Sequence, residues 1–334
     1  MKTKLFKDTI EDIKAAATIL ADGGLIAFPT ETVYGLGADA LNEEAVGKVY
    51  AAKGRPSDNP MIVHISSKDD FDQLTPEITE DMELLVAAFW PGPMTMVVKR
   101  TPVVPNVTTG GLDTVGVRMP DHPVALSLIE KAGTPIAAPS ANLSGKPSPT
   151  SAKHVIEDLE GRVDGIVISG DCAVGIESTV IDMTETTPMI LRPGIITKED
   201  MEAVLKKTVA MDPTLNQQPK QGEGQQLSPK SPGMKYKHYA PKAEMIIFEG
   251  SHEAVKAAIE REQKQREAED QKVFLLVFED EDQSAAAHQF FRKLRQADEE
   301  CADVILAMAL PENGIGFSVM NRMLKSAAYN IRKV

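Results

Sequence analysis

Helix and strand patterns alternate along the first two-thirds of the chain. Apolar residues recur at helical spacing from Ile10 to Leu20, and Thr9 precedes them in a position typical of an N-terminal cap. Asn42 is the predicted cap of a second helix over 42–53. We predict further helices over 78–89, 122–131, 151–159 and 198–207, and strands over 25–28, 61–65, 94–98, 114–119, 165–169 and 178–183. This alternation predicts an α/β fold with layers around one substantial sheet.

The last part of the chain repeats the alternation on a smaller scale. Apolar strands are predicted over 244–249, 272–279 and 302–309, with helices near 252–268, 284–298 and 314–329. Strands that alternate with helices in this way favour a small parallel sheet. Between the two parts, 209–243 is rich in Gln, Pro, Gly and Ser, which is typical of a linker. The predicted domains are therefore 1–208 and 244–334, joined by the linker 209–243.

The charge balance narrows the classes of function. Thirty-six Lys and Arg against forty-nine Asp and Glu give the 334 residues a formal charge of −13, whereas general nucleic-acid binders carry a basic surplus. A local basic pocket is compatible with this balance, because net charge does not fix the field inside a cleft. The two cysteines and six histidines show no metal-ligand spacing, although the fold could still assemble a metal site. The start lacks an apolar signal core and no apolar run is long enough to span a membrane, which favours a cytoplasmic protein.

One glycine motif bears on nucleotide binding. Gly35 to Ala40 matches G-x-G-x-x-A, which binds dinucleotides when it directly follows a strand and opens a helix. Here six residues separate the motif from the strand at 25–28, and the next helix begins only at Asn42. A nicotinamide-dependent oxidoreductase is therefore a weak alternative. No P-loop of the form G-x-x-x-x-G-K-[ST] occurs in the sequence.

Polar segments that adjoin predicted strands are the candidates for ligand contacts: 29–35, 53–60, 138–148, and 177–179 together with 191–194. Lys53 and Arg55 lie just past a helix C-terminus, where they either complement the helix dipole or clamp phosphate. The small polar residues of 138–148 either form an ordinary turn-rich loop or bring backbone N–H groups to an anion. Arg118 lies inside the apolar stretch TVGVRM, where burial is costly without a partner. We therefore predict that Arg118 pairs with either a ligand or an internal carboxylate.

The chain as a whole resembles a known enzyme family. In this order, PTETVYGLGADA, KGRPSDNPMIVHI, VGVRMPDHP, APSANLSGKPSPT, ESTVID and LRPGIIT resemble the motifs of the YrdC-type threonylcarbamoyl-AMP synthases. They cover most of 14–197, and SPGMKYKHYAP at 231–241 with the tail resembles the long, two-domain form. The resemblance implies a twisted YrdC-like α/β sheet domain with a large, positively charged cavity. It also implies a small Rossmann-like parallel domain, joined by a linker that closes over the cavity.

The resemblance implies the reaction as well. Family members are nucleotidyltransferases that condense L-threonine, bicarbonate and ATP to threonylcarbamoyl-AMP and pyrophosphate. The product serves the N6-threonylcarbamoyladenosine modification of tRNA beside the anticodon, through separate transferase proteins. We expect those partners to be transient and direct tRNA binding to be weak or absent. Mg²⁺ is the implied cofactor, held mainly by the ATP phosphates and water, because no dedicated carboxylate cage is visible.

Site residues follow from the motifs that match. Arg118 suits the threonine carboxylate as a bidentate partner, and Lys53 and Arg55 are implied to balance phosphate charge during catalysis. The implied threonine contacts are Thr32, His64, Arg118 and Ser178. The implied ATP contacts are Lys53, Arg55, Asn59, Thr114, Ala138, Ser140, Asn142, Ser148, Arg192 and Tyr236, with His238 or Tyr239 as alternatives to Tyr236.

Other classes of function stay open at this point. A protein that holds RNA in the cavity without chemistry is disfavoured by the charge of −13, and would show steep salt-dependent tRNA affinity without ATP. Carbamoyl transfer of the hydrogenase-maturation kind uses a related domain with acylphosphatase-like and cysteine-rich zinc modules, which two cysteines do not supply. The nicotinamide-dependent enzyme rests on 35–40 alone, and absence of NAD binding would exclude it.

Overall fold

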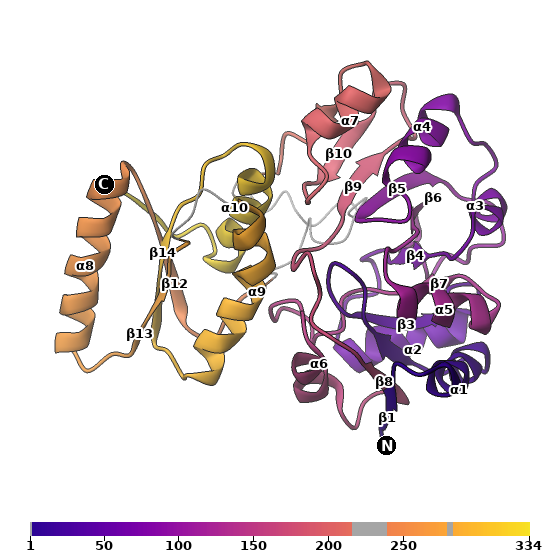
Figure 1. Ribbon diagram of the computed structural model, residues 1–334, viewed down its shortest axis with the longest axis horizontal. Coiled ribbons are helices and arrows are strands. Elements are labelled where there is room, and N and C mark those ends of the chain that lie inside the picture. The colour runs from indigo at the N-terminus through magenta and orange to yellow at the C-terminus, as the bar shows by residue number, and fades with distance from the viewer. Residues whose placement is uncertain (1, 216–238, 279–282) are drawn as a thin grey trace.

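The computed structural model describes residues 2–215, 239–278 and 283–334 and places two α/β units side by side (Figure 1). The N-terminal unit is built on an eleven-stranded mixed sheet, and the C-terminal unit on a four-stranded parallel sheet. The predicted fold class, a larger α/β domain followed by a small parallel one, is thereby confirmed. No helix in the described ranges combines the length and the apolar character that a membrane crossing needs.

The large sheet contains every strand predicted for the N-terminal part. In sheet order its strands are β1 (Lys4–Lys7), β8 (Gly165–Ile168), β2 (Ile26–Phe28), β3 (Gly35–Asp39), β7 (Ile136–Ala137), β4 (Ile62–His64), β6 (Thr114–Arg118), β5 (Met94–Lys99), β9 (Thr179–Asp182), β10 (Met189–Arg192) and β11 (Ala210–Met211). Its helices are α1 (Ile10–Ala21), α2 (Glu43–Lys53), α3 (Lys68–Leu74), α4 (Glu80–Phe89), α5 (Pro123–Ala132), α6 (Ala152–Leu159) and α7 (Lys198–Leu205).

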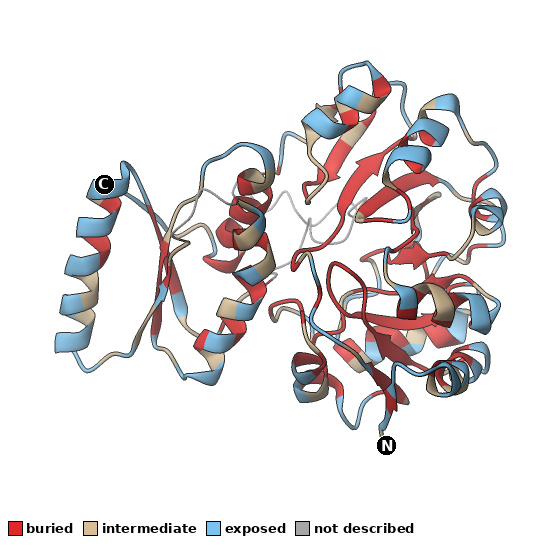
Figure 2. Cartoon of the chain, viewed as in Figure 1, coloured by how far each residue is buried: buried red, intermediate tan, exposed pale blue. Residues whose placement is uncertain are grey.

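Apolar clusters cover both faces of the large sheet. Ile26 and Phe28 of β2 pack with α1 and α5 on one face, whereas Ala27 between them belongs to the cluster that includes α2. This alternation is the two-residue period of a strand buried on both sides. Figure 2 accordingly shows strands that are buried (red), with helices whose outer sides are exposed (pale blue).

The glycine motif at 35–40 forms a strand and not a phosphate-binding turn. Gly35–Asp39 is β3, which runs antiparallel to β2. A Cβ added to Gly37 would lie 2.8 Å from both Ile136 Cγ2 and Phe28 Cε1, so close packing accounts for this glycine. The dinucleotide alternative is therefore wrong, because the motif does not lie at a strand-to-helix turn.

The small sheet is parallel throughout. In sheet order its strands are β13 (Val273–Leu276), β14 (Val304–Met308), β12 (Glu244–Glu249) and β15 (Ile331–Lys333). Its helices are α8 (His252–Ala268), α9 (Gln283–Glu299) and α10 (Gly314–Ser326). Helix α8 covers the outer face, whereas α9 and α10 lie between this sheet and the N-terminal unit (Figure 1).

Some short elements lie outside the predicted set, among them β1, α3, β11 and β15. Strand β15 consists of exposed residues, so it has no apolar pattern to detect. Helix α10 ends at Ser326, short of the predicted end, and Ala328 and Tyr329 then adopt positive φ. Strand β11 pairs with β10, so the large sheet extends past the predicted domain boundary at 208.

Candidate active site

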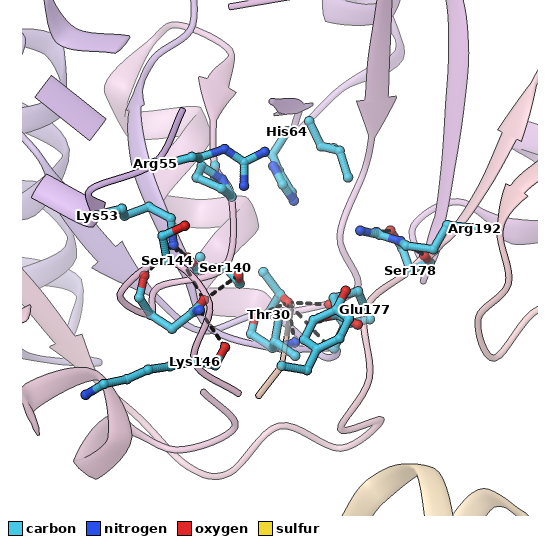
Figure 3. Close-up of a pocket in the computed structure, with 18 of the residues that line it drawn as sticks. Thr30, Lys53, Arg55, His64, Ser140, Ser144, Lys146, Glu177, Ser178 and Arg192 are labelled. Carbon is cyan, nitrogen blue, oxygen red and sulfur yellow. Dashed lines mark hydrogen bonds between the residues drawn. The ribbon is translucent and has the colours of Figure 1, made fainter. Parts of the chain in front are cut away.

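A pocket opens where several strands of the large sheet end (Figure 3). His64, Arg118 and Arg192 line it, and they are the last residues of β4, β6 and β10. Loop residues around 30–35, 138–146 and 177–178, the end of α2, and Tyr239 complete the lining. The pocket is thus assembled from segments that lie far apart in the sequence.

The four residues implied to contact threonine all line this pocket: Thr32, His64, Arg118 and Ser178. His64 and Arg118 are register partners on the parallel strands β4 and β6. Nη1 of Arg118 donates to Oγ1 of Thr32 at 2.9 Å, and its Nε donates to the carbonyl of Gly92 at 3.2 Å. The structure therefore brings the set together, while the ligand that they contact stays a prediction.

Glu31 is the internal partner of Arg118. Its Oε1 lies 2.6 Å from Nη2 of Arg118, and the two side chains are only 10% and 4% exposed. Of the two predicted partners of Arg118, a ligand or an internal carboxylate, the structure shows the carboxylate. Because a buried cation needs such a partner, Glu31 explains how the apolar strand β6 tolerates an arginine.

His64 is a neutral imidazole beside this ion pair. Burial, followed by the positive charge of Arg118, lowers the pKa of His64 to about 3. The side chain carries no charge at pH 7. It is therefore suited to hydrogen bonding with a ligand and not to neutralising a ligand carboxylate.

Lys53 connects the end of α2 to loop 138–146 through hydrogen bonds. It is the last residue of this helix and is buried, and its Nζ donates to the backbone carbonyls of Ser140 and Asn142. Oγ of Ser140 in turn donates to Oδ1 of Asn142 at 2.5 Å. Burial, and then the charge of Arg55, lower the pKa of Lys53 well below its usual value. These contacts give Lys53 a part in shaping the pocket wall, in addition to the implied phosphate contact.

Arg55 is a second, half-buried cation on the same side. Its Nη2 donates to the carbonyls of Asn59 and Pro60 at 3.3 and 3.0 Å. Burial lowers the pKa of Arg55 to about 10, so the side chain remains protonated at pH 7. Asn59 therefore supports Arg55 through its backbone and does not itself line the pocket.

The residues implied to contact ATP divide by position. Those that line the pocket are Lys53, Arg55, Ala138, Ser140, Asn142 and Arg192. Asn59, Thr114 and Ser148 do not line it, and their contact with ATP stays a prediction. Thr114 begins β6, about 13 Å along the strand from Arg118, and Ser148 is buried behind the wall. Tyr236 and His238 lie outside the described residues, whereas the alternative, Tyr239, lines the pocket.

Several lining residues received no role from the sequence, including Thr30, Ser144, Lys146 and Glu177. Glu177 is the first residue of the ESTVID motif, and this position was the one sign in the sequence that it belongs to the site. Its carboxylate is buried and accepts a hydrogen bond from Oγ of Ser148 at 2.6 Å. Burial of this kind depends on the packing of distant segments, which a local pattern does not report.

The pocket is cationic although the chain is acidic. The cations that line it are Lys53, Arg55, Arg118, Lys146 and Arg192, with Glu177 as a lining carboxylate. Such a lining favours an anionic ligand despite the net charge of −13. Within the described ranges, no group of three or more His, Cys, Asp or Glu is placed to hold a metal ion.

Both units match known protein families. A family model described as "Telomere recombination" matches residues 18–194, and one described as "Threonylcarbamoyl-AMP synthase, C-terminal domain" matches residues 196–328. The chain is 46% identical to the threonylcarbamoyl-AMP synthase of Pyrococcus abyssi. It is 43% identical to that of Bacillus subtilis, and each match covers 98% of this chain and 98% of the relative.

Solved structures agree with these matches. The structure of P. abyssi Sua5 complexed with L-threonine superposes with a TM-score of 0.93 at 44% identity, and the match covers 100% of both chains. E. coli YciO matches 58% of this chain and 96% of its own with a TM-score of 0.52 at 24% identity, which supports the fold alone. Because the full-length matches extend across both units, the chain belongs to the threonylcarbamoyl-AMP synthase family.

Proposed function

We propose that the chain condenses L-threonine, bicarbonate or CO₂, and ATP to threonylcarbamoyl-AMP and pyrophosphate, and is thus a nucleotidyltransferase. The observation that carries this proposal is one pocket with two sets of implied contacts. Figure 3 places Lys53 and Arg55 across the pocket from Ser178 and Arg192. Nη2 of Arg192 donates to Oγ of Ser178 at 3.1 Å, so an implied ATP contact directly adjoins an implied threonine contact. The proximity is what a reaction that joins the two substrates requires.

The threonine end offers a charged group and several hydroxyls. Arg118 is fixed by Glu31 and Thr32, which orients its guanidinium for the carboxylate of an amino acid. The hydroxyls of Thr32 and Ser178 and the neutral imidazole of His64 are then available for the hydroxyl and amine of threonine. A family relative that is complexed with L-threonine supports this assignment.

The chemistry needs positioning more than acid and base groups. The neutral amine of threonine adds to CO₂, loses a proton and forms a carbamate. A carbamate oxygen then attacks the α-phosphorus of ATP while the bond to the leaving pyrophosphate breaks. Lys53, Arg55 and Arg192 would stabilise the charge on the phosphates during this displacement.

The implied Mg²⁺ fits a site without a protein cage. Glu31 and Glu177, the carboxylates nearest the pocket, are already paired with Arg118 and Arg322. The cation would therefore be held by the ATP phosphates and water, which its coordination habits allow, and would supply charge neutralisation.

We further propose that the enzyme works in the cytoplasm and passes its product transiently to tRNA threonylcarbamoyl-transferase proteins. The product is a mixed anhydride that water destroys, so a short path to an acceptor protein suits its chemistry. The acidic net charge of −13 disfavours tight binding of tRNA by this chain alone.

One incubation tests the proposal. Purified protein is mixed with L-threonine, bicarbonate, Mg²⁺ and ATP, and pyrophosphate release is followed together with mass detection of the adenylate. Product that depends on both threonine and bicarbonate is the expected result. A protein that binds ATP and threonine but forms no adenylate would be a sensor or carrier, and the proposal would fail.

A further inference from the structure

Arg322 of the C-terminal unit is buried against the segments that form the pocket. Its Nε lies 3.1 Å from Oε2 of Glu177, and its Nη1 donates to the carbonyl of Pro193. The side chain is 1% exposed. Pro193 directly follows Arg192, and Glu177 directly precedes Ser178. Arg322 therefore contacts two pocket-lining segments from behind.

Glu177 is the residue through which this contact reaches the pocket. Its side chain lines the pocket and receives hydrogen bonds from Ser148 and Tyr239. Burial by itself would raise the pKa of Glu177, but Arg322, then Arg192, and the bond from Ser148 hold that pKa below its usual value. Glu177 is thus an ionised, buried carboxylate that needs a cationic partner.

Arg192 is the other cation that interacts with Glu177. Its Nε and Nη2 donate to the carbonyl and the Oγ of Ser178 at 3.0 and 3.1 Å, and its side chain reaches into the pocket (Figure 3). Because Glu177 directly precedes Ser178, these bonds hold the guanidinium of Arg192 beside the segment that carries Glu177, and its positive charge helps to keep the pKa of Glu177 low. The two arginines are therefore alternative partners for one carboxylate.

We propose that Arg322 is a positioning residue for the ATP side of the pocket. It neutralises Glu177 from the C-terminal unit, which leaves the guanidinium of Arg192 available to an anionic group of the nucleotide. The inference rests on the proposed function, since it takes Arg192 as a nucleotide contact. The C-terminal unit then contributes to ATP binding through a side chain that does not touch the nucleotide.

Two substitutions of similar volume separate charge from packing. Arg322→Met removes the charge, whereas Arg322→Lys keeps it. In the methionine variant we expect Arg192 to turn toward Glu177. ATP affinity, measured by calorimetric titration, then falls by about 10- to 150-fold, the range for the loss of one charge-assisted hydrogen bond. Threonine affinity changes far less because Arg118 keeps its own partner, and the lysine variant retains most of its ATP affinity.

A double variant tests the competition itself. In Arg322→Met/Glu177→Gln no carboxylate attracts Arg192, so ATP affinity recovers toward the wild-type value even where thermal stability does not. A merely structural role for Arg322 predicts no such recovery. Arg292→Ala is the control for domain docking, because it removes the exposed ion pair with Asp171 at 3.0 Å and leaves the buried contacts intact.

The ATP affinities of these variants decide whether Arg322 positions the ATP side of the pocket. Wild-type ATP affinity in Arg322→Met, or failure of the double variant to recover, overturns the proposal. Should the methionine variant not fold, the double variant decides, and a loss of more than about 10-fold relative to wild type overturns the proposal. A wild-type protein that binds ATP without forming adenylate refutes the proposed function and leaves the ATP titrations to test the role of Arg322.

Discussion

Replacement of Arg118 by alanine tests the threonine end of the pocket most directly. Arg118 is held by Glu31 at 2.6 Å, by Thr32 at 2.9 Å and by the carbonyl of Gly92 at 3.2 Å, so its guanidinium has one defined orientation. A charge-assisted hydrogen bond to a ligand contributes about 1.5–3 kcal/mol. Its loss is expected to raise the KM for threonine by about 10- to 150-fold. The KM for ATP is expected to change little, because Lys53 and the other implied phosphate contacts remain.

The same substitution also lowers stability, for a separate reason. Without Arg118, the carboxylate of Glu31 is buried and unpaired, and breaking a buried ion pair costs about 3–5 kcal/mol. Adding Glu31→Gln removes the stranded charge. The double variant Arg118→Ala/Glu31→Gln is therefore expected to regain much of the free energy of unfolding without regaining threonine binding.

Initial rates of pyrophosphate release, first against L-threonine and then against ATP, give the two KM values, and urea unfolding gives the stability. Arg100→Ala is a matched control, because Arg100 also donates to backbone carbonyls of the same unit, including that of Leu112 at 3.0 Å, but does not line the pocket. It is expected to lose stability with both KM values intact. An unchanged KM for threonine in folded Arg118→Ala would refute the assignment.

Other predictions follow from single contacts. Lys53→Ala is expected to lower turnover with ATP, since loop 138–146 loses its tie to α2 and the phosphates lose a cation; unchanged pyrophosphate release would contradict this. Because burial lowers the pKa of His64 from 6.5 to about 3, the unfolded chain binds one more proton between those values. The free energy of unfolding then falls by about 1.4 kcal/mol per pH unit as the pH drops through this window, and His64→Gln should flatten that slope in urea titrations. Gly37→Ala is expected to cost about 1–3 kcal/mol by overpacking, whereas Gly47→Ala, in open space on α2, should be neutral or stabilising by thermal unfolding.

Local chemistry made most of the fold predictable. Asn42 caps α2 by accepting from the N–H groups of the next turn, and Gly54 ends the same helix in a left-handed conformation. Both signals act within a few residues, so the sequence displays them. The strand at Gly37 is different. A side chain is excluded there because Phe28 and Ile136, from other strands of the sheet, lie too close. From its intrinsic propensity such a glycine is predicted to lie in a turn. Its position in a strand becomes clear only from the packing of the sheet.

The sequence predicted many of the residues that line the candidate site, but not the residues with which they pair. Motif resemblance named residues from separate segments, and many of them line one pocket. It did not specify which side of a strand or loop faces the ligand, so the roles of Thr114 and Ser148, which do not line the pocket, stay predictions. Glu177 and Arg322 lie 145 positions apart on different units, so their pairing depends on how α10 docks against the N-terminal unit. Sequence spacing therefore does not predict this ion pair.

Carboxylates near the pocket are paired with cations, and this reconciles a cationic pocket with an acidic chain. The pairs are Glu31 with Arg118, Glu177 with Arg322, and Asp158 with Lys146 and Arg295. Each pair removes a negative charge from the field in the pocket, so Lys53, Arg55 and Arg192 face a ligand with little competition. The chain as a whole carries a formal charge of −13, which disfavours binding of nucleic-acid phosphates outside this pocket. This distribution of charge favours an anionic ligand in one pocket, which is what the proposed synthesis of a small adenylate requires.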